Sequence, residues 1–268
     1  MKQTLSIEQK KNNLFIILGS IFITNAILAE MIGVKIFSLE KTIGFAPAQL
    51  QLLPDFKLDF NLTAGAIIWP IVFISTDIVN EYFGGKGVRK ISYLAACLIM
   101  YSFVILFIAT SISPADFWLN INSTDQNGQP FNIDYAFNKI FSQGLAIIVA
   151  SLTAFMIGQL LDLYVFHSIR KVTGGKYLWL RATGSTLISQ LIDSFVVLFI
   201  AFYLLAGDHK WTISQVISVG IINYIYKFSM AVLLTPLLYV AHHFIDTYLG
   251  LKNATKVIEE ANIKGYQN

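Results

Sequence analysis

Long apolar segments alternate with shorter polar ones along the whole chain. Six of these segments are long, and they cover residues 14–37, 63–83, 88–112, 140–166, 178–205 and 213–241. A helix needs roughly 20 apolar residues to cross a hydrocarbon core, and lipid offers no partners for exposed backbone groups. We therefore expect an all-α polytopic membrane protein with six transmembrane helices, in which residues 1–268 form a single membrane domain. The first segment is too long for a signal peptide and contains polar residues, so we interpret it as a retained helix.

The positively charged residues predict the orientation of these helices. Lysine and arginine gather at the N-terminus, in the 84–90 and 167–181 turns and in the C-terminal tail, whereas the 113–138 loop is mainly acidic. Loops on the cytoplasmic side of a membrane carry an excess of lysine and arginine. Both termini are therefore expected to be cytoplasmic, and the long 38–62 and 113–138 loops are expected to face outside.

Composition agrees with a membrane protein and excludes several other classes. Hydrophobic residues make up 55% of the chain and charged residues 13%, with a mean hydropathy of +0.62, whereas soluble domains carry about 25% charged residues. The net charge of +3 is too small to indicate a nucleic-acid binder. The single cysteine, Cys97, excludes an internal disulfide and a cysteine-rich metal site.

Charged and amide side chains recur inside the apolar segments. A charged residue at the centre of a spanning helix costs about 2.5–3.5 kcal/mol, so such residues usually face a bundle interior or a cavity. Here they recur every three or four residues, which places them on one helical face. The sets are Asp77, Asn80 and Glu81; Gln159 and Asp162; Thr186, Gln190 and Asp193; and Asn223 and Lys227. We expect segments 1, 2, 4, 5 and 6 to line a polar cavity, and the nearly all-apolar segment 3 to face lipid or a neighbour.

Two of these polar stripes resemble each other. Gln159-Leu-Leu-Asp162 recurs as Gln190-Leu-Ile-Asp193 on the next segment, so we expect both glutamine–aspartate pairs to line one cavity. Asp193 and Lys227 both lie near the middle of their segments. Because an unpaired ammonium group there would lose its proton or find a partner, we expect these two side chains to pair or to share a substrate.

The residue types in the stripes limit the chemistry. All four histidines lie at segment ends or in turns, which argues against a histidine-based metal site. The Gly84-Gly85-Lys86-Gly87 turn lacks the phosphate-loop pattern, so we expect neither ATP binding nor any cofactor. Carboxylates and amides suit a neutral or cationic ligand that donates hydrogen bonds, such as a guanine-like edge, on which Phe155 could stack. An aspartyl dyad, and with it an intramembrane enzyme, stays open as an alternative.

Five runs of residues, in order along the chain, match the pattern of a known family. They are Asn25-Ala26-Ile27-Leu28-Ala29 with Lys35; Asp77-Ile78-Val79-Asn80-Glu81-Tyr82-Phe83-Gly84; Ser151-Leu152-Thr153-Ala154-Phe155 before Gln159 and Asp162; Trp179-Leu180-Arg181 before Ser185 and Ser189-Gln190-Leu191-Ile192-Asp193; and Lys227 before Thr235-Pro236-Leu237-Leu238-Tyr239. Together these runs resemble the queuosine precursor transporter family, within the vitamin uptake transporter superfamily. Asn80 stands where that family more often has threonine.

The resemblance implies a function that the residues alone do not establish. It implies a bacterial inner-membrane transporter, not an enzyme, that imports 7-cyano-7-deazaguanine, 7-aminomethyl-7-deazaguanine or both for tRNA queuosine salvage. The expected partners are this 7-deazapurine and the lipid bilayer, with no nucleic acid and no ATPase module. Small residues on several segments permit a homodimer. A substrate-binding subunit of an energy-coupling transporter remains an alternative.

The resemblance also supplies the candidate site. No catalytic residue and no metal ligand is expected. The substrate-binding candidates are Asn25, Asp77, Glu81, Gln159, Asp162, Gln190, Asp193 and Lys227, and further candidates are Lys35, Asn80, Phe155, Arg181, Ser185 and Asn223. Lys35 and Arg181 could instead reach the membrane interface and have no direct role.

Overall fold

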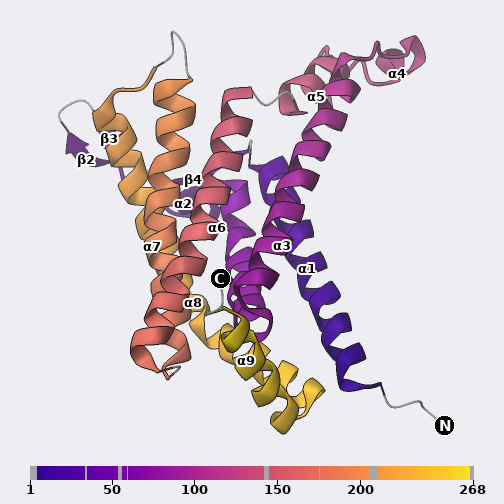
Figure 1. Ribbon diagram of the computed structural model, residues 1–268. Helices are drawn as coiled ribbons and strands as arrows, with labels where there is room; N and C mark the ends of the chain where they lie inside the picture. The colour runs from indigo at the N-terminus through magenta and orange to yellow at the C-terminus, as the bar shows by residue number, and fades with distance from the viewer. Residues whose placement is uncertain are drawn as a thin grey trace.

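A bundle of long apolar helices forms the body of the protein (Figure 1). The computed structural model describes residues 5–33, 35–53, 56–58, 60–141, 145–174, 176–205 and 210–265. Five helices in this part of the chain are long and apolar enough to cross a membrane. They are α1 (Ile7–Ile32), α3 (Trp69–Ser111), α6 (Leu145–Thr173), α7 (Leu178–Leu198) with its π-helical continuation η2 (Phe199–Leu204), and α8 (Ile213–Leu249). The expectation of an all-α polytopic membrane protein is confirmed.

Helix α3 folds back on itself at Gly84, whose backbone is non-helical with φ 67° and ψ −174°. Thr76 and Ser92 lie on opposite sides of this glycine, yet their hydroxyl oxygens lie 3.4 and 3.3 Å from Oε1 of Gln159. The two residues would be about 24 Å apart in a continuous helix. The two arms of α3 therefore run back along each other and correspond to the predicted segments 63–83 and 88–112. The count of six crossings and the cytoplasmic placement of both termini stay predictions.

Several helix ends differ from the predicted ones, and local signals in the sequence explain most of the differences. α1 begins at Ile7 rather than at residue 14, because Ser6 and Gln9 form a capping box. α3 begins at Trp69 rather than at residue 63, with Pro70 in its first turn. α6 covers Leu145–Thr173 instead of 140–166. α8 extends past residue 241 to Leu249 and ends at Gly250, which has a φ of 85°.

The two long loops lie at one end of the bundle (Figure 1). The first contains β1 (Ile36–Ser38), α2 (Leu39–Thr42), β2 (Leu50–Leu53), β3 (Phe56–Leu58), β4 (Asn61–Thr63) and the 3-10 turn η1 (Ala64–Ile67), with antiparallel pairs β1–β4 and β2–β3. The second contains α4 (Asp116–Ile121) and α5 (Ile133–Phe141). The start of α1 and the turn between α6 and α7, both rich in lysine and arginine, lie at the opposite end.

Glu40 organises the first loop. Its carboxylate accepts hydrogen bonds from the Phe60 N–H (2.8 Å), the Ala48 N–H (3.3 Å) and the Ser38 hydroxyl (2.9 Å). These bonds, with the Phe60 N–H first among them, lower the pKa of Glu40 from 4.5 to about 2. Glu40 is therefore an anion at neutral pH that ties distant parts of the loop together.

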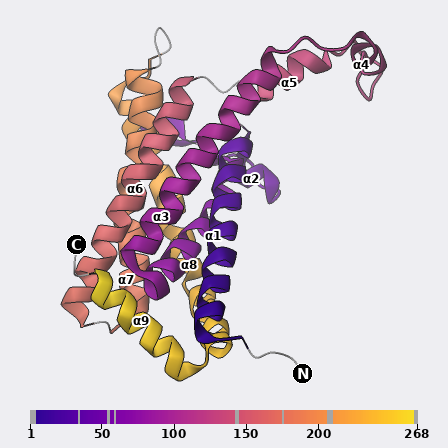
Figure 2. The ribbon, with the colours of Figure 1, turned by 45° about the vertical axis from the view of Figure 1, so that its right-hand side comes forward.

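The C-terminal tail contains a helix that the sequence did not predict. α9 (Leu251–Gly265) buries Ala254, Val257 and Ala261 along one face and crosses the end of the bundle at which α1 begins (Figure 2). It lies so close to the fold in α3 that a Cβ on Gly84 would be 2.7 Å from the carbonyl oxygen of Ala261. The salt bridge Lys11–Glu260 (3.2 Å) also ties α9 to α1.

The second arm of α3 differs in part from the expectation for segment 3. Val88, Ile91, Ala95, Ile99 and Phe103 are buried at helical spacing. A Cβ on Gly19 of α1 would lie 3.5 Å from the Ile91 side chain, so this stripe packs inside the bundle. Large apolar side chains on the rest of the arm, such as Phe107 (70% exposed), are free to face lipid.

Candidate functional site

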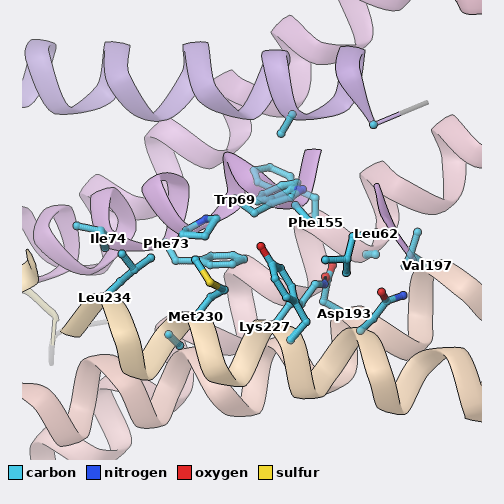
Figure 3. Close-up of a pocket in the computed structure, with 18 of the residues that line it drawn as sticks. Leu62, Trp69, Phe73, Ile74, Phe155, Asp193, Val197, Lys227, Met230 and Leu234 are labelled. Carbon is cyan, nitrogen blue, oxygen red and sulfur yellow. Dashed lines mark hydrogen bonds and ion pairs between the residues drawn. The ribbon is translucent and has the colours of Figure 1, made fainter. Parts of the chain in front are cut away.

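A cavity of about 440 Å³ lies among α1, α3, α6, α7 and α8. Ligand pockets of small molecules commonly have volumes of about 300–1,000 Å³. Trp69, Phe73 and Phe155 form one wall, and Met230 and Leu234 of α8 face them across the cavity (Figure 3). The Trp69 ring centroid lies 5.7 Å from that of Phe73 and 5.8 Å from that of Phe155. These apolar and aromatic walls can hold a flat ring.

One polar group in this cavity is the ion pair of Asp193 and Lys227. Nζ of Lys227 lies 2.5 Å from Oδ2 of Asp193, and the two side chains are 19% and 21% exposed. The pairing expected from their central positions is confirmed. Asn223 precedes Lys227 by one helical turn and lines the same cavity, so donors and acceptors are grouped together here.

A second polar group joins α1 to α6. The Ser151 hydroxyl donates a 2.6 Å hydrogen bond to Oε2 of Glu30, and both residues line the cavity. Glu30 is not among the predicted ligands, although an acidic residue inside an apolar segment is a signal for function. Trp69, Phe73 and Tyr226 are also missing from the predicted set. Nothing in the sequence distinguishes them from the other aromatic residues of the chain, which has 4 tryptophans, 21 phenylalanines and 12 tyrosines.

A much smaller cavity adjoins the first. Its polar lining comes from Thr76 of α3, Gln159 and Asp162 of α6, and Ser189, Gln190 and Asp193 of α7. The expectation that both glutamine–aspartate pairs border one cavity is thus confirmed. Trp69, Phe73, Phe155 and Asp193 line both cavities, so the two spaces share a wall.

Two buried contacts lie nearer the end of the bundle at which α1 begins. Glu81 and Arg170 form an ion pair of 3.4 Å between α3 and α6, with both side chains only 5% exposed. The Tyr82 hydroxyl donates to Oδ1 of Asp246 (2.6 Å) and lies 3.0 Å from Nδ1 of His242. These contacts join the first arm of α3 to α6 and α8, so they can stabilise this arrangement of the bundle.

The remaining candidates differ in their positions. Asp77 and Phe155 line the main cavity. Asn25 donates a 2.7 Å hydrogen bond to the Ile21 carbonyl of its own helix. Asn80 and Ser185 are fully buried, and Lys35 is exposed after the end of α1. Five of the candidates lie outside the lining of both cavities: Asn25, Lys35, Asn80, Glu81 and Ser185. The side chain of Arg181 lies outside the described residues.

Comparison with known proteins identifies the family. The family model described as "Putative vitamin uptake transporter" matches residues 63–241. The chain belongs to this family. A "Probable queuosine precursor transporter" of Bacillus subtilis is 32% identical over 209 residues, which cover 76% of this chain and 82% of that protein.

Two further relatives of this vitamin uptake transporter come from other bacteria. A "Probable queuosine precursor transporter" of Haemophilus influenzae is 28% identical, over 67% of each chain. The "Queuosine precursor transporter" of Escherichia coli is 26% identical over 66% of this chain and 71% of its own. No solved structure matches the chain. The bacterial relatives and the long apolar helices make this a multi-pass protein of the bacterial inner membrane.

Proposed function

We propose that this protein imports queuosine precursors, as 7-cyano-7-deazaguanine, 7-aminomethyl-7-deazaguanine or both, for tRNA queuosine salvage. The observation that carries the proposal is the similarity to the Bacillus subtilis relative, which extends over 76% of the chain. The match to the family model, over residues 63–241, includes α3, α6, α7 and most of α8, which line the main cavity. A cavity of about 440 Å³ within those helices supports it, because a deazapurine base is a small flat molecule.

The cavity chemistry suggests how such a base would be held. The ring would stack against Trp69, Phe73 or Phe155, while a carboxylate would accept the ring N–H and exocyclic amino hydrogens of its guanine-like edge. Asp77 or Glu30 suits this role, because Asp193 is already paired with Lys227.

The predicted ligands then fall into three groups. Asp77, Asp193 and Lys227, together with Asn223, would contact the substrate. Gln159, Asp162 and Gln190 would act from the adjoining small cavity. Asn25 and Glu81 would need a rearrangement of the bundle to reach it.

Restoration of queuosine in cells tests the proposal. The host should lack both precursor synthesis and its own importer, and it should be supplied with 7-cyano-7-deazaguanine. We expect the wild-type chain to restore queuosine in tRNA, and Asp193→Asn to abolish restoration at equal membrane abundance. Asp116→Asn, a matched change in the exposed helix α4, should behave as wild type.

Two other results would contradict the proposal or change it. No restoration from a correctly inserted wild-type chain would remove the deazaguanine assignment. Restoration that requires a co-expressed energy-coupling ATPase module would show that the chain is the substrate-binding subunit of a larger transporter.

A further inference from the structure

We propose that the small cavity between α3, α6 and α7 binds one sodium ion, and that this ion drives uptake; the second part rests on the proposed function. The cavity has a volume of about 10 Å³, which is close to the space that one water molecule needs. A single small ion therefore fits, whereas an organic substrate does not.

The lining supplies the oxygen atoms that a hard cation prefers. Thr76 and Ser189 contribute hydroxyl groups, Gln159 and Gln190 contribute amide carbonyls, and Asp162 contributes a carboxylate. The carboxylate of Asp193 also lines this cavity, but the Lys227 ammonium balances its charge. Asp162 then adds one negative charge among neutral oxygens, which suits a monovalent cation better than a divalent one, because a divalent cation usually binds more carboxylates.

One buried oxygen atom in this lining lacks a hydrogen-bond partner among the described residues. Gln190 is only 4% exposed, lines the cavity, and has no hydrogen-bond partner for Oε1 among the described residues. The Thr76 hydroxyl donates its hydrogen to the Val72 carbonyl over 3.0 Å, so the lone pairs of its oxygen can still bind a cation. A buried polar atom without a partner is unfavourable, so a cation bound to these oxygens would stabilise the site.

The charges nearby also favour a cation. Asp77 is 6% exposed, its Oδ1 has no hydrogen-bond partner among the described residues, and its carboxylate and that of Asp162 repel each other. Glu81 adds a third carboxylate, but it forms an ion pair with Arg170. A proton could remove one of the two remaining charges, but it would not bind the oxygens of Asp162, Gln159 and Gln190 at the same time. Sodium can do both.

The position of the site explains how ion and substrate would be coupled. Its ligands come from the first arm of α3, from α6 and from α7, and these helices also form walls of the main cavity. An ion that holds them together orders Trp69, Phe73 and Phe155, which line both spaces. Because coupling between two binding sites is reciprocal, sodium should raise substrate affinity and substrate should raise sodium affinity.

Thermal unfolding tests the ion site without any substrate. The purified full-length chain in detergent should melt about 5 °C higher in saturating sodium chloride than in potassium or choline chloride of equal ionic strength. Gln190→Leu and Asp162→Asn should each lower the apparent sodium affinity at least tenfold, because each removes or weakens one ligand of the ion. Gln129→Leu, in an exposed loop, is the matched control and should respond as wild type.

Equal melting temperatures in the three salts would overturn the site, as would an unchanged sodium response in both cavity variants. Uptake into proteoliposomes then tests the coupling: an inward sodium gradient should accelerate it, and a pH gradient without sodium should not. Acceleration by the pH gradient alone would overturn sodium coupling and assign the role to a proton. Absence of uptake under any gradient would overturn the proposed function together with the coupling, while the melting shift would still decide the ion site.

Discussion

Replacement of Lys227 by methionine tests whether the ion pair in the main cavity holds α7 and α8 together. Methionine keeps the length and the apolar part of the side chain but removes the charge. Asp193 then loses a partner that lies 2.5 Å away, in a place where only 21% of its side chain is exposed. The change therefore isolates the electrostatic part of the contact.

The magnitude follows from the geometry. The centres of the two charges lie farther apart than the contacting atoms, at about 4 Å, and attract by about 4 kcal/mol at an effective dielectric constant of about 20, which suits a partly exposed pair. Partial loss of hydration of both groups offsets some of this attraction. We expect a net coupling energy of about 2 kcal/mol, and a loss of about 3 kcal/mol for Lys227→Met, because the aspartate is left without its counter-charge.

Thermal unfolding of Lys227→Met, Asp193→Asn and the double variant in detergent gives this coupling energy as a double-mutant cycle. The double variant should be more stable than Lys227→Met, because it buries no unpaired charge. All three variants should lose uptake. Additive effects of the two changes on stability, or full stability and uptake of Lys227→Met, would refute the reasoning.

Three further predictions address other parts of the molecule. Glu81→Gln should destabilise the chain by about 3 kcal/mol in thermal unfolding, because the buried Arg170 loses its counter-ion; a loss under 1 kcal/mol would contradict this. Gly84→Ala should lower the free energy of unfolding by about 2 kcal/mol in the same assay, since a φ of +67° strains any side chain and the added Cβ would meet the Ala261 carbonyl. A wild-type melting temperature would contradict this. The Glu40 anion should support its loop fully above pH 4.5 and lose this effect as the pH falls through about 2. Pepsin should therefore cut the loop faster at the acid end of that window, and the Glu40→Gln variant should lack the pH step.

Most of the fold could be predicted from the pattern of apolar residues. The thickness of the hydrocarbon core and the need for backbone hydrogen bonds leave a long apolar segment few structures other than a spanning helix, so the helices could be predicted. Their ends were less predictable, because they depend on local signals such as the Ser6 capping box and Gly250. α9 was missed because it is amphipathic rather than apolar, and its buried face matches a surface that exists only after α3 has folded at Gly84.

The candidate site was predictable where a polar residue would be costly in lipid. Asp193 with Lys227, and the two glutamine–aspartate pairs, were brought together as expected. Helical spacing shows which residues share a face, but it does not show which helix that face meets. Thus Asn25 donates a hydrogen bond to its own helix, and Glu81 pairs with Arg170 outside the cavity. Glu30, by contrast, lines the cavity and accepts a hydrogen bond from Ser151.

The most direct test of the central claim is uptake by the purified chain alone in proteoliposomes. Radiolabelled 7-cyano-7-deazaguanine should enter in a saturable way with no other protein present, and an excess of unlabelled 7-aminomethyl-7-deazaguanine should compete with it if both are substrates. Entry should fall to the level of empty vesicles with Asp193→Asn and stay normal with Asp116→Asn. No entry above that of empty vesicles, from correctly folded protein, would contradict the assignment of this chain as a self-sufficient importer of queuosine precursors.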